Sequence, residues 1–120
     1  MVAVTRADDA AAPRIVDTED GAWFLVEWGS ALYLDARYSC SALIDDSALI
    51  RLDETELAAY ERGGHGYLND LAERVHMSAP YQSTSTFHAR NVYLHDGMGW
   101  LRGAITAAVI THRMRREGRA

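Results

Sequence analysis

Apolar and polar side chains alternate between residues 32 and 44, and this is the clearest pattern in the chain. The even positions are all apolar: Leu32, Leu34, Ala36, Tyr38, Cys40, Ala42 and Ile44. The odd positions include the polar residues Asp35, Arg37, Ser39 and Ser41. Because successive side chains of a β-strand point to opposite faces, this period of two predicts a strand whose even positions face a core.

A β-hairpin is predicted at the start of this strand. The apolar run Trp23–Trp28 is separated from residues 31–38 by Gly29-Ser30. A two-residue loop that begins with glycine is typical of a hairpin, because glycine readily adopts the positive φ that such turns need. The predicted register places three pairs face to face: Trp28 with Ala31, Val26 with Tyr33, and Phe24 with Asp35. The polar triplet Asp45-Asp46-Ser47 then predicts a turn, and apolar residues 48–52 predict a third antiparallel strand.

A long helix is expected directly after these strands. Asp53 is a predicted N-cap, and Glu56 lies at the capping-box position three residues later. Three glycines between positions 63 and 66 interrupt the apolar face of this helix, each at a cost of about 1 kcal/mol. We therefore expect helical structure that ends near Met77 and is either one kinked helix or two helices divided at the glycines.

The remaining segments complete an α+β fold. Residues 81–94 carry no decisive pattern, whereas apolar residues at helical spacing predict a C-terminal helix over about residues 100–116. Residues 1–20 are expected to form a flexible acidic tail, in which Ile15-Val16 is a weak candidate for a short edge strand. The prediction is a single α+β domain over residues 21–120: an antiparallel β-meander followed by a long helix and a C-terminal helix.

The composition is that of an ordinary globular protein. The chain has 120 residues, of which 48% are hydrophobic and 24% are charged. Its one cysteine, Cys40, excludes an intramolecular disulfide, and its place in the apolar row indicates a buried structural thiol rather than a nucleophile. Neither a secretory signal nor a run of about 18 apolar residues is present. These features predict a cytoplasmic protein without a membrane partner.

Charge is unevenly distributed along the chain, although its formal net value is only −5. Residues 1–73 contain 15 acidic residues and 5 arginines, whereas residues 74–120 contain 2 acidic residues and 7 arginines. A net acidic charge disfavours a dedicated duplex-DNA binder, so nucleic acid is not an expected partner. The polarised charge indicates either a protein partner that meets one end of the molecule or a contact between its two halves.

The residues suited to acid–base chemistry are few and scattered. His88, His95 and Asp96 are the one candidate grouping, in which Asp96 would orient a histidine for proton transfer. The five histidines of the chain lack the spacing of a metal motif. The sequence therefore predicts no metal and no cofactor, and His88, His95 and Asp96 are only weak catalytic candidates.

The second face of the hairpin is the best candidate for a partner-binding surface. If the even row of the long strand faces the core, then Phe24, Val26, Trp28 and Tyr33 point away from it. Large exposed apolar patches are rare on monomers and typically mark a protein interface. The alternative is that the C-terminal helix covers this face.

Two functional hypotheses follow from these observations. The leading one is a small cytoplasmic, non-catalytic protein-binding or regulatory domain, either homodimeric or acting as an acidic inhibitor-type binder. The alternative is a small enzyme or ligand-binding protein with a His/Asp pocket. Contact among His88, His95 and Asp96 separates the two, because proton transfer or shared ligation requires these side chains to meet.

Overall fold

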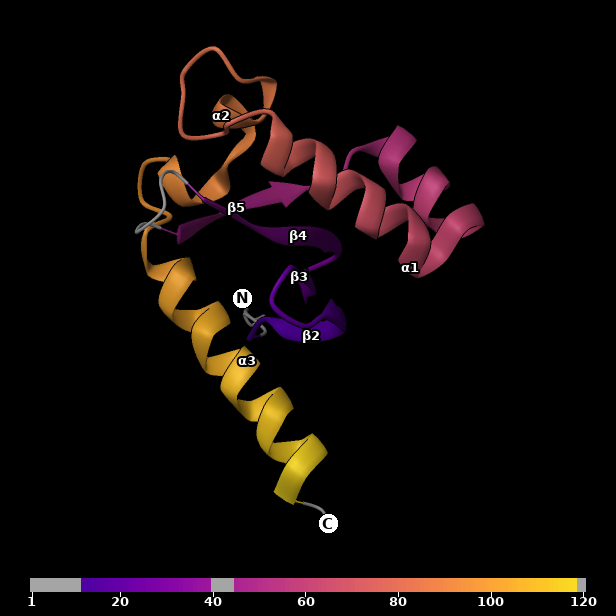
Figure 1. The fold of residues 1–120 in the computed structure, drawn as a ribbon. Coiled ribbons are helices and arrows are strands. Elements are labelled where there is room, and N and C mark those ends of the chain that lie inside the picture. The colour runs from indigo at the N-terminus through magenta and orange to yellow at the C-terminus, as the bar shows by residue number, and fades with distance from the viewer. Residues whose placement is uncertain (1–11, 40–44, 119–120) are drawn as a thin grey trace, which may run out of the picture.

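The structure, a computed structural model, describes residues 12–39 and 45–118. Its centre is a four-stranded antiparallel sheet in the order β2-β3-β4-β5 (Figure 1). The strands are β2 (Arg14–Glu19), β3 (Trp23–Trp28), β4 (Ala31–Ser39) and β5 (Asp45–Arg51). The helical elements that follow are α1 (Glu54–Met77), α2 (Thr86–Arg90), the 3-10 turn η1 (Val92–Leu94) and α3 (Trp100–Gly118). The predicted α+β order of meander, long helix and C-terminal helix is confirmed.

The predicted hairpin register is also confirmed. Its Cα partners are Trp28 with Ala31, Val26 with Tyr33, and Phe24 with Asp35. Gly29 begins the connecting turn with a φ of 63°, a value that glycine adopts without strain. This register directs the apolar even row of β4 toward α1 and its odd row toward α3. The end of the predicted row, including Cys40, lies outside the described residues.

The sheet separates two hydrophobic cores, because α1 lies against one face and α3 against the other (Figure 1). The first core joins the even row to α1 and includes Leu25, Leu34, Leu68, Leu71 and Val75. The second core joins the odd row to η1 and α3 and includes Val26, Tyr33, Leu49, Leu101 and Ile105. The C-terminal helix therefore covers much of the face that the sequence left open as a partner surface.

Helix α1 begins with the predicted capping box and bends in its middle. The Asp53 carboxylate accepts from the Glu56 amide at 2.8 Å, and the Glu56 carboxylate accepts from the Asp53 amide at 2.9 Å. Gly64 has a φ of 59° and a ψ of −139°, so two helical segments meet there at a sharp kink (Figure 1). This backbone matches the alternative of two helices divided at the glycines, because Gly64 is non-helical and separates the two segments of α1. No helix in the described part of the chain has the length and apolar content needed to cross a membrane.

Two segments differ from their predictions. Residues 14–19 of the predicted tail form β2, which pairs with β3 and buries Ile15 in the second core. The pairing changes register between Ile15 and Asp17, so β2 lacks the regular alternation by which strands are recognised. The triplet Asp45-Asp46-Ser47 is not a turn but the beginning of β5, paired with the end of β4. Polar side chains are accommodated there because this part of the sheet lines an open groove beside α3, which is described below.

Candidate functional site

The weak catalytic candidates make local contacts in the structure. The His88 ring lies 3.0 Å from the Pro80 carbonyl oxygen, and the His95 ring lies 3.0 Å from that of Ala89. Within residues 12–39 and 45–118, no hydrogen bond or ion pair joins the two histidines to each other or to Asp96. No group of three His, Cys, Asp or Glu side chains in these ranges is placed to hold a metal ion. The two histidines thus support the turns around α2 and η1.

The predicted partner-binding residues lie mainly inside the second core. Val26 is fully buried and Tyr33 is nearly so, with 7% of its surface exposed. Trp28 is half-buried and packs edge-on against Trp100 of α3, with ring centroids 5.5 Å apart. Phe24 is also half-buried, but it borders the open groove. A partner can therefore reach Phe24 directly, whereas Val26 and Tyr33 stabilise the packing of α3.

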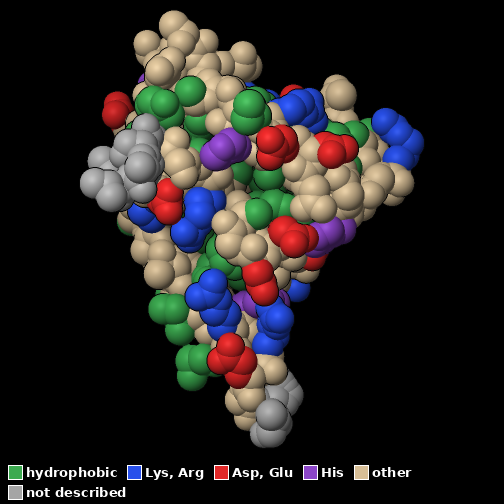
Figure 2. Space-filling model, viewed as in Figure 1, with side chains coloured by type: hydrophobic (Ala, Val, Ile, Leu, Met, Phe, Trp, Pro, Cys, Tyr) green, Lys and Arg blue, Asp and Glu red, His purple; other side chains and the backbone are tan. Residues whose placement is uncertain are grey.

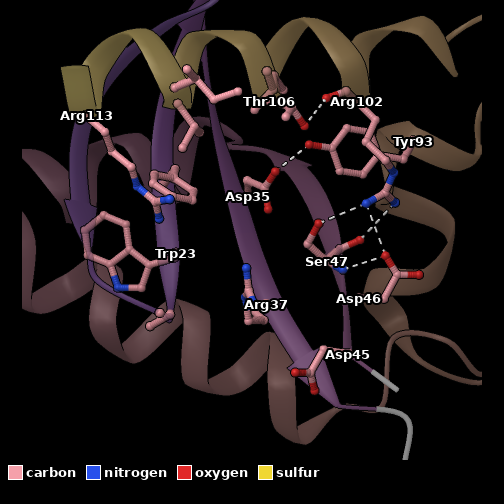
Figure 3. A pocket seen from close by; sticks show the side chains of 16 residues that line it. Trp23, Asp35, Arg37, Asp45, Asp46, Ser47, Tyr93, Arg102, Thr106 and Arg113 are labelled. Carbon is pink, nitrogen blue, oxygen red and sulfur yellow. Dashed lines mark hydrogen bonds and ion pairs between the residues drawn. The ribbon is translucent and has the colours of Figure 1, made fainter. Parts of the chain in front are cut away.

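A groove of about 550 Å³ opens between α3 and the polar part of the sheet (Figure 3). Its helix wall consists of Arg102, Ile105, Thr106, Val109, Ile110 and Arg113. Its sheet side includes Phe24, Asp35, Arg37, Asp45, Asp46 and Ser47, and η1 contributes Tyr93. We call this space the α3 groove. Its volume lies within the range of about 300–1,000 Å³ that is typical of ligand sites.

The groove forms because the second face of the sheet is apolar in one part and polar in another. Where the strands carry Val26 and Leu49, α3 packs against them through Ile105. Where they carry Asp35, Arg37 and Ser47, the helix finds no apolar side chains to pack against, and the groove lies between the two elements. Arg102 in the first turn of α3 bridges this gap to Ser47 and Asp46. The alternation that predicts β4 thus also determines where the groove lies.

A hydrogen-bonded pair lies at the floor of the groove, where the Tyr93 hydroxyl donates to Oδ2 of Asp35 (Figure 3). Burial raises the pKa of the Asp35 carboxyl, and hydrogen bonds from Tyr93 and Ser47 offset part of that effect. Burial and the neighbouring Asp35 also raise the pKa of the Tyr93 hydroxyl, which keeps it protonated. Arg102 lies over the Tyr93 ring, 4.0 Å from its centroid, and pairs with Asp46 at 3.1 Å.

The carboxylates that line the groove accept hydrogen bonds from the protein, whereas two of its arginines make no ion pair in the described part of the chain. Each lining carboxylate accepts from the protein: Asp35 from Tyr93, Asp46 from Arg102 and the Ser47 amide, and Asp45 from the Ser39 hydroxyl. Arg37 and Arg113 make no ion pair within the described part of the chain. The groove therefore offers guanidinium donors to a ligand, while its carboxylates are engaged.

Sequence reasoning identified Phe24 but did not identify the charged residues of this groove. It treated Asp35 and Arg37 as the polar face of a strand and left open whether the C-terminal helix lies opposite them. The available signal was the helical spacing of Arg102, Thr106 and Arg113, which gives α3 a polar row of its own. The polar positions of β4 and α3 come together through contacts between distant residues, such as that of Asp35 with Tyr93, which are 58 positions apart. No local pattern in the sequence predicts such a contact.

Comparison with known proteins found no match: no family model matches the chain, and neither the curated proteins nor the solved structures gave a significant similarity.

Proposed function

We propose that this chain is a small, non-catalytic, cytoplasmic binding domain that regulates another protein by holding a segment of it in the α3 groove. The observation that carries the proposal is the lining, in which an apolar wall lies beside Arg37 and Arg113. A protein segment presents apolar side chains and charged groups together, so it matches both features. An inhibitor-type binder, which occupies its target and blocks it, is one form of this function.

The chemistry of the groove supports binding rather than catalysis. The raised pKa of Tyr93 keeps its hydroxyl protonated near neutral pH, and Asp35 accepts its hydrogen bond from within the protein. Three arginines and three aspartates line the groove, so it lacks the basic surplus that nucleic acid requires. A protein segment is therefore the proposed occupant.

The test is a substitution that fills the groove. Thr106 lines it from α3 with an exposed side chain, so Thr106→Trp places an indole where the partner segment would lie. Thr111→Trp is the matched control, because Thr111 is an exposed threonine of the same helix outside the groove. Proteins captured from native extract by the wild type and by T111W, but lost with T106W, are the expected result.

Binding of a captured protein is then measured by calorimetry with both purified components. We expect T106W to weaken it by about tenfold or more, as for removal of a central contact in an interface, and T111W to leave it unchanged. Equal affinities for T106W, T111W and the wild type would exclude the groove as the binding site.

The alternative function, a ligand-binding protein or small enzyme, is favoured by one observation. Asp35 is a carboxyl whose pKa is raised by burial at the floor of a pocket, a combination that often marks a functional site. In this version the groove takes a small molecule, and His88, His95 and Asp96 are not involved. If a small molecule raises the thermal stability of the wild type but not that of Asp35→Asn, the ligand-binding alternative is favoured over the protein-binding proposal.

Self-association is a second form of protein binding that the surface of α3 supports. Ile110 and Met114 lie one turn apart on this helix and are 52% and 65% exposed. Apolar side chains are visible along the outer edge of α3, beyond the sheet (Figure 2). Because exposed apolar side chains at helical spacing are typical of helix pairing, we propose that two copies associate along this part of α3.

A further inference from the structure

The guanidinium groups of Arg37 and Arg113 enter the α3 groove from opposite walls. Arg37 projects from β4 and Arg113 from α3, and both side chains reach into the space between helix and sheet (Figure 3). The Arg37 amide donates to the Ala22 carbonyl at 2.9 Å, and β4 is paired on both sides, so the backbone below this arginine is held firmly. Two cations are thus presented to the same space from separate elements.

Arg102, the third arginine of the groove, is already engaged. It donates to the Ser47 hydroxyl at 3.2 Å and pairs with the Asp46 carboxylate at 3.1 Å, while its guanidinium lies over the Tyr93 ring. These contacts fix Arg102 as part of the wall. Of the three guanidinium groups that line the groove, those of Arg37 and Arg113 make no ion pair within residues 12–39 and 45–118, and each has a planar fork of N–H donors.

We propose that Arg37 and Arg113 bind carboxylate groups, and that the protein segment held in the α3 groove is acidic. This inference rests on the proposed function and specifies the chemistry of its partner. Arginine forks pair with carboxylates through two parallel hydrogen bonds, and such charge-assisted bonds are stronger than neutral ones. The apolar side chains of Phe24, Ile105 and Val109 lie in the same groove, so the segment carries apolar residues between its acidic ones.

A carboxylate suits this groove better than a phosphate. The lining includes the carboxylates of Asp35, Asp45 and Asp46, which repel an incoming anion. A phosphate monoester carries a charge of about −1.5 to −2 near neutral pH, whereas a carboxylate carries one negative charge. Attraction to the arginines also grows with the charge of the ligand, but the lining has as many aspartates as arginines, so a doubly charged ligand gains no net attraction. It costs more to remove from water than a carboxylate, and the mixed lining therefore favours the weaker anion.

The test is calorimetric titration with a short synthetic peptide in which glutamate and leucine alternate. Its counterpart with glutamine in place of glutamate reports apolar binding alone. The variants Arg37→Gln and Arg113→Gln each remove one proposed donor from an exposed position. Arg115→Gln is the matched control, because it removes the same charge from an exposed position of α3 that does not line the groove.

We expect the glutamate peptide to bind the wild type and R115Q equally, and to bind R37Q and R113Q about tenfold more weakly. The glutamine peptide is expected to bind the wild type at least about tenfold more weakly than the glutamate peptide. Circular dichroism shows whether each variant keeps its fold, and the two variants on different elements provide independent readings.

Three results would overturn the inference: no binding of the glutamate peptide, equal weakening in R115Q, or tighter binding of inorganic phosphate than of the peptide. Free glutarate separates the two sources of a carboxylate, because binding it as tightly as the peptide would assign the site to a small acid rather than to a protein segment. If T106W still abolishes capture of a cellular protein while the glutamate peptide fails to bind, the proposed function stands and only its acidic specificity is wrong.

Discussion

His65 joins the kink of α1 to strand β2 through two carboxylates. Its ring nitrogens lie 3.0 Å from Oδ2 of Asp17 and 2.7 Å from Oε1 of Glu19, and the ring packs against Trp23 at a centroid distance of 4.8 Å. Hydrogen bonds to Glu19 and Asp17 raise the pKa of His65 above its ordinary value of 6.5. The protonated ring is therefore the form that the folded protein favours.

The pH dependence of stability follows from this shift. The folded pKa of His65 is higher than the unfolded one, so its contribution is fully present below the unfolded pKa and is lost as pH rises through the folded value. The difference in unfolding free energy between the wild type and His65→Gln should accordingly shrink as pH increases from about 5.5 to about 8.5.

Urea unfolding of the two proteins across this range measures the difference, and an NMR titration of the His65 ring gives its pKa directly. A difference that stays constant with pH, or a ring pKa at or below 6.5, would show that Asp17 and Glu19 do not stabilise the charged form.

At the scale of single elements, the glycines of α1 have distinct roles. Gly64 has a positive φ of 59° at the kink, which an L side chain adopts only with strain. Gly66 lies in a helical segment, without a positive φ, and a Cβ there would meet nothing within 4 Å. The kink therefore depends on Gly64, while Gly66 is a helical position that alanine can occupy.

These roles predict substitutions of opposite sign. Gly64→Ala should lower the free energy of unfolding by about 1–3 kcal/mol through backbone strain. Gly66→Ala should raise it by about 0.5–1 kcal/mol, because alanine loses less backbone entropy in a helix. Urea unfolding of the two variants measures both values. Stabilisation by Gly64→Ala would mean that α1 can straighten without cost.

At the scale of the whole molecule, the fold was more predictable than the site. The Gly29 turn, the alternation of β4 and the capping box of Asp53 and Glu56 are local signals, and each predicted its element correctly. Strand β2 escaped recognition because a register shift breaks its short pattern. The α3 groove could not be predicted, since it depends on where α3 crosses a sheet that is distant in sequence.

The sheet face that packs against α3 is a second case in which local patterns in the sequence did not predict a contact between distant segments. The sequence correctly placed Phe24, Val26, Trp28 and Tyr33 on one side of the sheet, but it left open whether α3 would cover them. In the structure, Leu101 and the rest of the second core bury that apolar part and leave the polar part accessible. Partner binding is accordingly proposed at the charged groove beside these residues.

Self-association of the whole molecule leads to a further prediction. If copies pair through the exposed Ile110 and Met114, light scattering should show a mass that rises toward that of two chains with concentration. Met114→Glu should hold the protein at the mass of one chain. Arg115→Gln, which changes the charge by the same amount at an exposed position on another side of α3, should not. A single-chain mass for the wild type at all concentrations would exclude this pairing.

The α3 groove as the binding site is tested most directly by NMR of the isotope-labelled chain, titrated with a purified protein that the wild type captures. The account predicts that the largest changes in amide chemical shift cluster around the groove, at Arg37, Ser47, Thr106 and Arg113. Changes that cluster instead on the outer surface of α1, with these four residues unaffected, would contradict it.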